Sequence, residues 1–101
     1  MSAYTNEAQQ RILKVFSLLF NDIVQGVYAK QICQALGESP SNVHRDLVNL
    51  KEAGCAIQDE HTGAWRVSPR HGQNAIKIFN AFERSQRMVD EARNRYAVIP
   101  D

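Results

Sequence analysis

The segment VYAKQICQALGESPSNVHRDLVNLKEAGCAIQDEHTGAWRV, residues 27–67, decides the fold of this chain. An apolar stripe over residues 29–36 predicts a short helix, and Gly37 follows where a left-handed C-terminal cap is expected. Ser39 is a good N-cap for a second helix over residues 40–53, which starts on a proline and stops before a glycine. Two helices joined by a turn of about three residues that opens on glycine have the helix-turn-helix layout.

The hydrophobic period changes after Gly54. Residues 57–59 and 65–67 alternate apolar and polar side chains, and residues 60–63, EHTG, lie between them and end in glycine. This pattern predicts a β-hairpin. Val27, ahead of the first short helix, can pair briefly as a further strand.

Two more helices flank this segment. Asn6 and Gln9 have the spacing of a capping box, so a helix is expected to start near Asn6. Its apolar positions recur at three- and four-residue steps through Ile12, Val15, Phe16, Leu19, Phe20 and Ile23. Residues 73–97 are also helical in pattern. We therefore predict a mostly α fold with a small β-hairpin wing: a winged helix-turn-helix domain over residues 1–69, then a long C-terminal helix in residues 70–101.

Composition predicts one modest globular domain. The chain has 101 residues, of which 44% are apolar and 23% charged, as in ordinary soluble proteins. No apolar run approaches the roughly 18 residues that a membrane span needs, and no basic region leads into an apolar stretch at the N-terminus. We expect a cytoplasmic protein without a membrane partner.

Metal, cofactor and enzymatic functions are not expected. Cys33 and Cys55 lack a CxxC spacing and are expected to be reduced, mostly buried thiols. The histidines His44, His61 and His71 are scattered, which argues against a zinc site. The sequence has no paired carboxylates in a motif, no glycine-rich phosphate loop, and no nucleophile with a base at a telling spacing.

The second helix of the helix-turn-helix is expected to expose a face suited to DNA. At about 100° per residue, Val43, Leu47 and Leu50 point together toward the core. Arg45 and Asn49 point the other way, with Ser41, Val48 and Glu52. Arg45 can reach guanine through its two-pronged guanidinium, and Asn49 can read adenine. Short polar groups near the helix N-terminus suit phosphate contacts: Ser39, Ser41, Asn42 and His44.

Several of these residues also have a purely structural interpretation. Ser39 is explained as an N-cap and Asn42 as a second capping residue, while His44 can be a satisfied structural histidine and Arg45 simply solvated. The net charge of +1, from 12 basic and 11 acidic residues, argues against strong non-specific binding to nucleic acid. The functional interpretation of these polar residues depends on the fact that they share one face of the helix over residues 40–53, which this layout exposes.

Residues 27–67 resemble the winged helix-turn-helix domain of the IclR family of bacterial regulators. With the first helix, the resemblance covers roughly the first 70 residues. The matching stretches are ICQALG (32–37), SNVHRDLVNL (41–50), EAG (52–54) and IQDEHTGAWRV (57–67). The resemblance implies that the helix over residues 40–53 reads DNA, with Ser41, His44 and Arg45 at or near its contact surface. It also implies that the wing around His61 and Arg66 approaches the DNA backbone.

The sequence departs from the family pattern at informative positions. Tyr28 stands where the family commonly has a serine or threonine that caps the helix over residues 29–36. Asp46 replaces an apolar residue at the edge of the core and needs a basic partner there. Glu38, Asp46 and Glu52 put negative charge on or beside the reading helix, which lowers affinity for phosphates unless these groups face away. Residues 70–101 do not resemble the family's large effector-binding domain, and we expect one long helix there in its place.

The C-terminal helix has two interpretations. In one, Ile76, Phe79 and Phe82 pack back on the first helix and complete a monomer core. In the other, the apolar face extends to Tyr96, interrupted at Gln86 and Arg93, and pairs with a second copy. We favour the homodimer, because two-fold symmetry doubles the contacts that one winged helix makes. Its contact residues are then Phe79, Phe82, Val89 and Tyr96.

The leading functional hypothesis is a sequence-specific regulator of transcription that binds duplex DNA, a small repressor or an accessory regulator without enzymatic activity or cofactor. The alternative is a winged-helix module for protein–protein interaction in a larger assembly. The near-neutral charge and the acidic residues beside the reading helix favour this alternative.

Overall fold

The computed structural model describes residues 3–99, which form five helical segments and two strands. The elements are α1 (Glu7–Leu18), the 3₁₀ turn η1 (Leu19–Asn21), α2 (Ala29–Leu36), α3 (Pro40–Glu52), β1 (Ala56–Gln58), β2 (Trp65–Val67) and α4 (Arg70–Ala97). The described chain divides into two compact units that meet between Pro69 and Arg70. The outermost residues of both predicted domains, 1–2 and 100–101, lie outside the described part of the chain.

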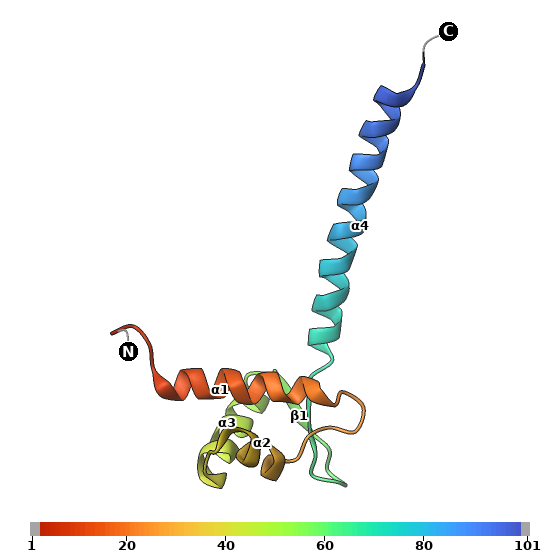
Figure 1. Ribbon diagram of the computed structural model, residues 1–101. Coiled ribbons are helices and arrows are strands. Elements are labelled where there is room, and N and C mark those ends of the chain that lie inside the picture. The colour runs from red at the N-terminus through yellow and green to blue at the C-terminus, as the bar shows by residue number, and fades with distance from the viewer. Residues whose placement is uncertain (1–2, 100–101) are drawn as a thin grey trace. The chain divides into compact units, whose positions relative to one another are not determined.

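The first unit is a three-helix core with a hairpin, as predicted. α1 and α2 both pack against α3, and the hairpin follows α3 (Figure 1). The largest side chains that are fully buried come from all three helices and from η1: Val15, Leu19, Ile32, Val43 and Leu47. Their burial removes apolar surface from water, which stabilises the folded unit by roughly 25 cal/mol per Å². This core holds α3 in place by one face.

Local capping signals set the helix-turn-helix. Gly37 has φ 65°, the left-handed conformation expected at the end of α2. The Ser39 Oγ accepts a hydrogen bond from the Asn42 amide at 3.2 Å, so Ser39 is the N-cap of α3. The predicted weakness at Tyr28 is offset, because its amide donates to the Gln31 Oε1 at 2.8 Å. The turn between α2 and α3 is therefore fixed by contacts within four residues.

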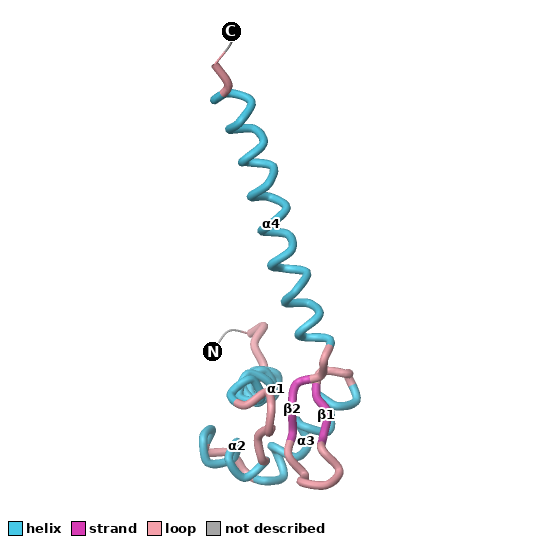
Figure 2. The backbone as a smooth tube through the Cα atoms, turned by 90° about the vertical axis from the view of Figure 1, so that its right-hand side faces the viewer, coloured by secondary structure: helices cyan, strands magenta, loops and turns pink. Residues whose placement is uncertain are grey.

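The hairpin pairs β1 and β2 in antiparallel register, with Ile57 opposite Arg66 (Figure 2). Val27 adds the expected third pairing, since its amide and carbonyl both bond Trp65 at 2.8 Å. The phase of the first strand differs from the sequence pattern. Ala56 is buried and Ile57 is 39% exposed, because the register places Ala56 opposite Val67 and Ile57 opposite Arg66, on the other face of the hairpin.

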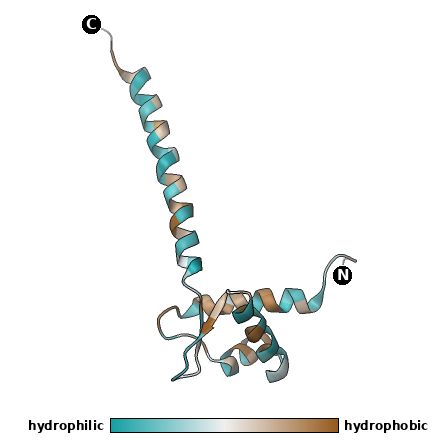
Figure 3. Cartoon of the chain, turned by 180° about the vertical axis from the view of Figure 1, so that it is seen from behind, coloured by the Kyte–Doolittle hydropathy of each residue, from teal (hydrophilic) through white to brown (hydrophobic). Residues whose placement is uncertain are grey.

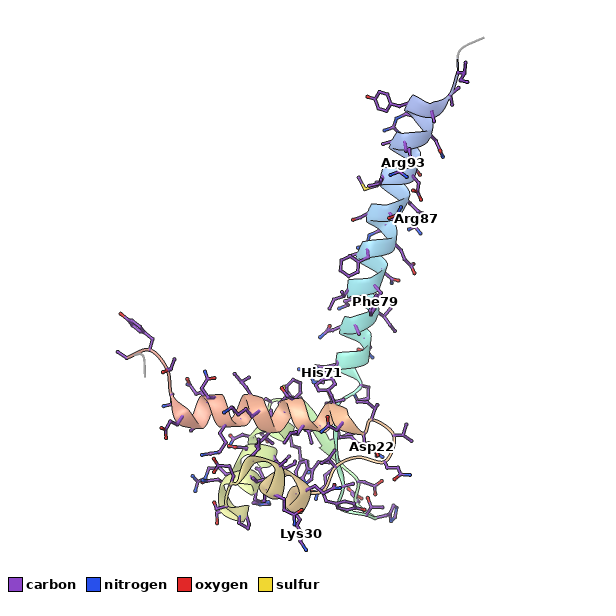
Figure 4. The ribbon with its side chains drawn as sticks, in the orientation of Figure 1. Asp22, Lys30, His71, Phe79, Arg87 and Arg93 are labelled. Carbon is purple, nitrogen blue, oxygen red and sulfur yellow. The ribbon has the colours of Figure 1, made fainter. Side chains whose placement is uncertain are left out.

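A close approach explains the glycine before Val27. Gly26 has φ +89°, and a Cβ there would lie 2.9 Å from the Trp65 carbonyl oxygen and from the Arg66 Cγ. Asp22, labelled in Figure 4, shapes the same loop by accepting hydrogen bonds from the Val24 and Gln25 amides. The loop therefore lies directly against β2.

The second unit is the single helix α4, which begins at Arg70, three residues before its predicted start, and ends at Ala97 as predicted. None of its residues is buried. Figure 3 shows apolar and polar residues interspersed along it. No helix within residues 3–99 is both long and apolar enough to cross a membrane.

Candidate nucleic-acid interface

α3 separates its side chains into two faces. Val43 and Leu47 are fully buried and Leu50 is 7% exposed, which confirms the predicted core face. The opposite face is exposed over the whole length of the helix, through Ser41, His44, Arg45, Val48, Asn49 and Glu52. His44 therefore does not occupy the core position that its structural interpretation required. This outer face is the surface that α3 offers to a partner.

Along the exposed face of α3 lie the cation of Arg45, then the methyl groups of Val48, then the amide of Asn49. No side-chain hydrogen bond of the Arg45 guanidinium occurs within the described residues. The Asn49 Nδ2 donates to the Arg45 carbonyl oxygen at 2.8 Å, so the amide must rotate away from its own helix before it can bind a base. Val48 lies between them and is 46% exposed.

The N-terminal end of α3 keeps its polar groups close together. Ser39 caps the helix, and the Asn42 Nδ2 donates to the Glu38 Oε2 at 3.3 Å. Both residues thus have structural roles, while Ser41 and His44 are exposed beside them. The helix dipole adds partial positive charge at this end.

Asp46 is the buried polar residue of α3, and it faces α1. The Arg11 Nε and Nη2 donate to its two carboxylate oxygens at 2.7 and 3.0 Å. This two-pronged bond raises the pKa of Arg11 above its ordinary value, and the charges of Asp46 and Glu38 raise it further against the effect of desolvation. The expected basic partner of Asp46 is therefore Arg11, and the Asp46 charge points away from the exposed face.

The other two acidic residues differ from Asp46. Glu38 is half-buried at the α2–α3 turn and interacts with Asn42 and, through its charge, with Arg11. Glu52 is exposed in the last turn of α3, next to Lys51. Only Glu52 thus remains on the exposed face without an opposite charge among the contacts of the described chain.

Asp59 organises the wing. Its Oδ1 accepts hydrogen bonds from the His61 amide at 2.8 Å and the Thr62 amide at 3.0 Å, and its carbonyl accepts from Gly63. These amides, Thr62 first, hold the pKa of Asp59 below its ordinary value, and the positive charges of Arg66 and His61 lower it further. Sequence reasoning missed this role, although an aspartate two and three residues before turn amides is a recognisable turn signal.

The lowered pKa of Asp59 predicts a wing that loosens in acid. A depressed folded-state pKa adds stability above the unfolded pKa, and this stability is lost as the pH falls below about 4 and through the folded value. We expect the fluorescence of Trp65, the single tryptophan, to report this change. In an Asp59→Asn variant the acid transition of the wing should disappear. An unchanged fluorescence titration in that variant would contradict the role of Asp59.

The predicted wing residues lie in different settings. His61 is exposed at the turn. Arg66 is engaged within the protein, since its Nη1 donates to the Val24 carbonyl oxygen at 3.1 Å and its Nη2 lies 3.5 Å from the Asp59 Oδ2. Arg66 thereby joins the wing to the loop before α2, and its contact with a DNA backbone stays a prediction.

The predicted contact residues of the C-terminal helix all lie in α4 and are exposed. Phe79 and Phe82 stack edge to face with ring centroids 6.3 Å apart, and Val89 and Tyr96 continue along the helix. Figure 4 shows side chains, among them Phe79, Arg87 and Arg93, projecting along its length. Elsewhere in the described chain both cysteines are half-buried thiols outside any disulfide, and no three His, Cys, Asp or Glu side chains are grouped to hold a metal ion.

Comparison with known proteins places this architecture among regulators. No protein-family model matches the sequence. The chain is 37% identical over 89 residues to the HTH-type transcriptional regulator BhcR of Paracoccus denitrificans. The match covers 85% of this chain but only 29% of the length of BhcR.

Two solved structures have the same fold. Pseudomonas aeruginosa HmgR aligns with a TM-score of 0.64 at 17% identity, over 77% of this chain and 33% of that one. The second Z-DNA binding domain of human DAI, in complex with Z-DNA, aligns with a TM-score of 0.52 at 29% identity, over 66% of this chain and 98% of that one. The chain therefore has a winged-helix domain of the DNA-binding type that is related to bacterial transcriptional regulators. None of these proteins is named as an enzyme, in agreement with the sequence prediction.

Proposed function

We propose that this chain is a sequence-specific, duplex-DNA-binding regulator of transcription whose first 69 residues are an IclR-type winged helix. In this proposal α3 enters the major groove and the hairpin wing lies along the backbone. The observation that carries it is the outer face of α3, where Arg45, Val48 and Asn49 are exposed together while Asp46 is paired inward with Arg11. The similarity to BhcR supports the assignment to a regulator.

The chemistry of this face suits the major groove. Arg45 has the planar donor fork that matches the O6 and N7 acceptors of guanine, and Asn49 can pair with the N6 and N7 of adenine once its amide is released. Val48 is placed to contact a thymine methyl group. Ser41 and His44 reach toward phosphates beside the helix N-terminus, with Ser39, Asn42, His61 and Arg66 in supporting positions.

Selection of bound sequences from a random duplex library tests the proposal. A sequence-specific regulator should enrich one motif, and binding of that motif should exceed binding of random duplex by at least about 10³-fold. If no duplex binds at micromolar protein, the chain is instead the protein-interaction module that its near-neutral charge also fits. A cytoplasmic location is part of the proposal, since that is where bacterial DNA lies.

A second candidate ligand is left-handed duplex DNA. It is favoured by the 29% identity to the DAI domain, which was solved in complex with Z-DNA. The two ligands are distinguished by comparing the selected B-form motif with an alternating d(CG) duplex held in the left-handed form. Circular dichroism monitors the handedness of that duplex during the titration. Preferred binding to it would replace the sequence-specific mechanism by recognition of backbone shape.

Arg45→Ala should relax specificity at one base pair. Loss of a bidentate guanine contact costs about 1–3 kcal/mol, or roughly a 5- to 150-fold weaker Kd, and discrimination at that position should vanish. Glu52→Gln is the matched control on the same face, and it should tighten binding slightly by removing a charge that repels phosphate. Fluorescence anisotropy with the selected duplex and its single-base variants measures both. An unchanged Kd and base preference in Arg45→Ala would refute the assignment of α3 as the reader.

The proposed regulator is a homodimer that pairs through α4, residues 70–101 serving as the dimerisation segment. Phe79, Phe82, Val89 and Tyr96 are exposed by 64, 65, 49 and 90%. A row of large apolar side chains in water is typical of an interaction surface. Two readers on one dimer extend the DNA sequence that is recognised.

A further inference from the structure

The residues of α4 that share one side follow a strict seven-residue repeat. Steps of three and four residues connect Ala75, Ile78, Phe82, Ser85, Val89, Ala92 and Tyr96. With Phe82 and Val89 at position a, Ile78, Ser85 and Ala92 fall at position d of a coiled-coil heptad. We call these seven residues the α4 seam. Gln86 and Arg93, which interrupt the face when Phe79 is included, fall beside the seam at position e.

A period of 3.5 residues has a specific physical meaning. A straight helix repeats every 3.6 residues, so a strict heptad stays on one side only when two helices wind around each other. α4 has 28 residues and no buried side chain, and most helical stability in proteins comes from packing of an apolar face. We therefore expect the α4 seam to pack against another helix.

The side-chain sizes of the seam residues from Ile78 to Tyr96 are arranged as complements about position 87. Counting outward from the middle, Ser85 and Val89 are one pair, Phe82 and Ala92 the next, and Ile78 and Tyr96 the last. Each pair joins a smaller to a larger side chain, and each joins a d to an a position. Two antiparallel copies place a opposite d, so the central layers combine a small with a large residue and Ile78 meets the larger Tyr96, which favours even packing.

A parallel pair has the opposite property. It places Phe82 opposite the partner's Phe82 and Ser85 opposite the partner's Ser85, so crowded and underfilled layers follow each other. Both overpacking and cavities are destabilising. In the antiparallel pair, Arg93 also lies beside the partner's Phe79, where a guanidinium and an aromatic ring attract each other.

The area available is adequate for a stable pair. Phe82 and Tyr96 give four aromatic side chains in the seam of a dimer, and each buries roughly 150–250 Å² when it is fully covered. Together they contribute about 600–1,000 Å², at least about half of the lower bound of the roughly 1,200–2,000 Å² of specific interfaces. The aliphatic seam residues add to this area.

We infer that α4 pairs with α4 of a second copy of this chain as an antiparallel two-stranded coiled coil, in which Ser85 lies opposite the partner's Val89 and Phe82 opposite the partner's Ala92. This inference rests on the proposed homodimer and specifies its orientation and register. The complementary size pattern selects a second copy over an unrelated partner, because a seam that complements itself is required only for self-pairing.

Disulfide trapping tests the orientation directly. Ser85→Cys and Val89→Cys variants are prepared separately, mixed, equilibrated in a glutathione redox buffer and digested with trypsin. Cleavage after Arg84, Arg87 and Arg93 separates the two engineered sites into peptides 85–87 and 88–93, and places Cys33 and Cys55 in other peptides. We expect the mixed disulfide between 85–87 and 88–93 to dominate, at least about tenfold over either symmetric product.

A matched pair on the outer side controls for random collision. Asn80→Cys and Asn94→Cys occupy the same layer of the antiparallel pair but point away from the seam, so their mixture should remain uncrosslinked. Light scattering of each variant confirms that it is folded as a dimer. A dominant symmetric disulfide at position 85 means a parallel pair and overturns the inference while the homodimer stands. A monomeric wild type overturns both the antiparallel arrangement and the proposed homodimer. The proposed DNA binding is tested separately, by fluorescence anisotropy.

Discussion

Replacing Arg11 with methionine is expected to lower the melting temperature of the winged-helix unit by ~10 °C or more. The substitution keeps the length of the side chain but leaves the Asp46 carboxylate 4% exposed and without its two hydrogen bonds from Arg11. Removing one partner of a buried ion pair is strongly destabilising, because the remaining charge stays desolvated. Thermal unfolding followed by far-ultraviolet circular dichroism measures the effect.

The double variant Arg11→Met with Asp46→Leu should recover most of that stability. Well-packed apolar residues often replace a buried ion pair without loss of stability, and the resemblance to the IclR family places an apolar residue at position 46. Lys14→Met is the matched control, since Lys14 is exposed on the same helix, and it should shift the melting temperature by no more than about 2 °C. A small shift in Arg11→Met, similar to that of the control, would show that the ion pair is not needed.

The ion pair also matters for the proposed function. It connects the middle of α3 to α1 across 35 residues of sequence, and the neighbouring Arg45 is exposed on the same turn. A helix fixed on its inner side presents its outer side chains at a constant angle. The pairing also takes the Asp46 charge off the exposed face, which reduces repulsion of phosphate in a chain whose net charge is only +1.

Phe82→Glu is expected to convert the proposed dimer into a monomer. In the antiparallel pair the introduced carboxylate would replace a large apolar side chain in the layer that faces the partner's Ala92, and symmetry places it twice in the interface. A residue at an interface hot spot contributes about 2 kcal/mol or more, so two copies weaken dimerisation by roughly 10³-fold or more. Light scattering across a range of protein concentrations gives the dimer dissociation constants of the wild type and of the Phe82→Glu variant.

Ile76→Glu provides the matched control for this experiment. Ile76 is 61% exposed and close to Phe82 in the sequence, but it lies outside the α4 seam. The Ile76→Glu substitution should leave the dimer intact. Any variant that remains dimeric should keep the helical content of the wild type. If both variants dimerise as the wild type does, the seam is not the interface. If Ile76→Glu alone is monomeric, the heptad assignment is wrong.

Much of the fold follows from local signals. Gly37, Ser39 and Pro40 each act within one helical turn, so the bounds of α2 and the start of α3 agree with the sequence prediction. The change from a helical to an alternating pattern after Gly54 similarly predicted the hairpin, and the outer face of α3 followed from its 3.6-residue period. α4 begins at Arg70, three residues before its predicted start, and Gly72 lies inside the helix.

Contacts between distant residues were not accessible in the same way. The sequence required a basic partner for Asp46 but gave no means of choosing Arg11 among 12 basic residues, because that choice depends on how α1 crosses α3. Arg66 was assigned to the wing surface, and only the tertiary structure places the Val24 carbonyl, 42 residues away, within reach of its guanidinium. The phase of β1, with Ala56 inward, was likewise decided by its register with β2, which pairs Ala56 with Val67.

The amino-acid sequence by itself thus determined the order and type of the elements and the face that α3 exposes, because capping, turn and periodicity signals act over two to four residues. The tertiary structure decided which charges of the helix-turn-helix are available to a partner: Asp46 is turned inward to Arg11, Arg66 is held by Val24 and Asp59, and Arg45 stays exposed. These assignments depend on the packing of helices far apart in the chain, and no local pattern encodes that packing.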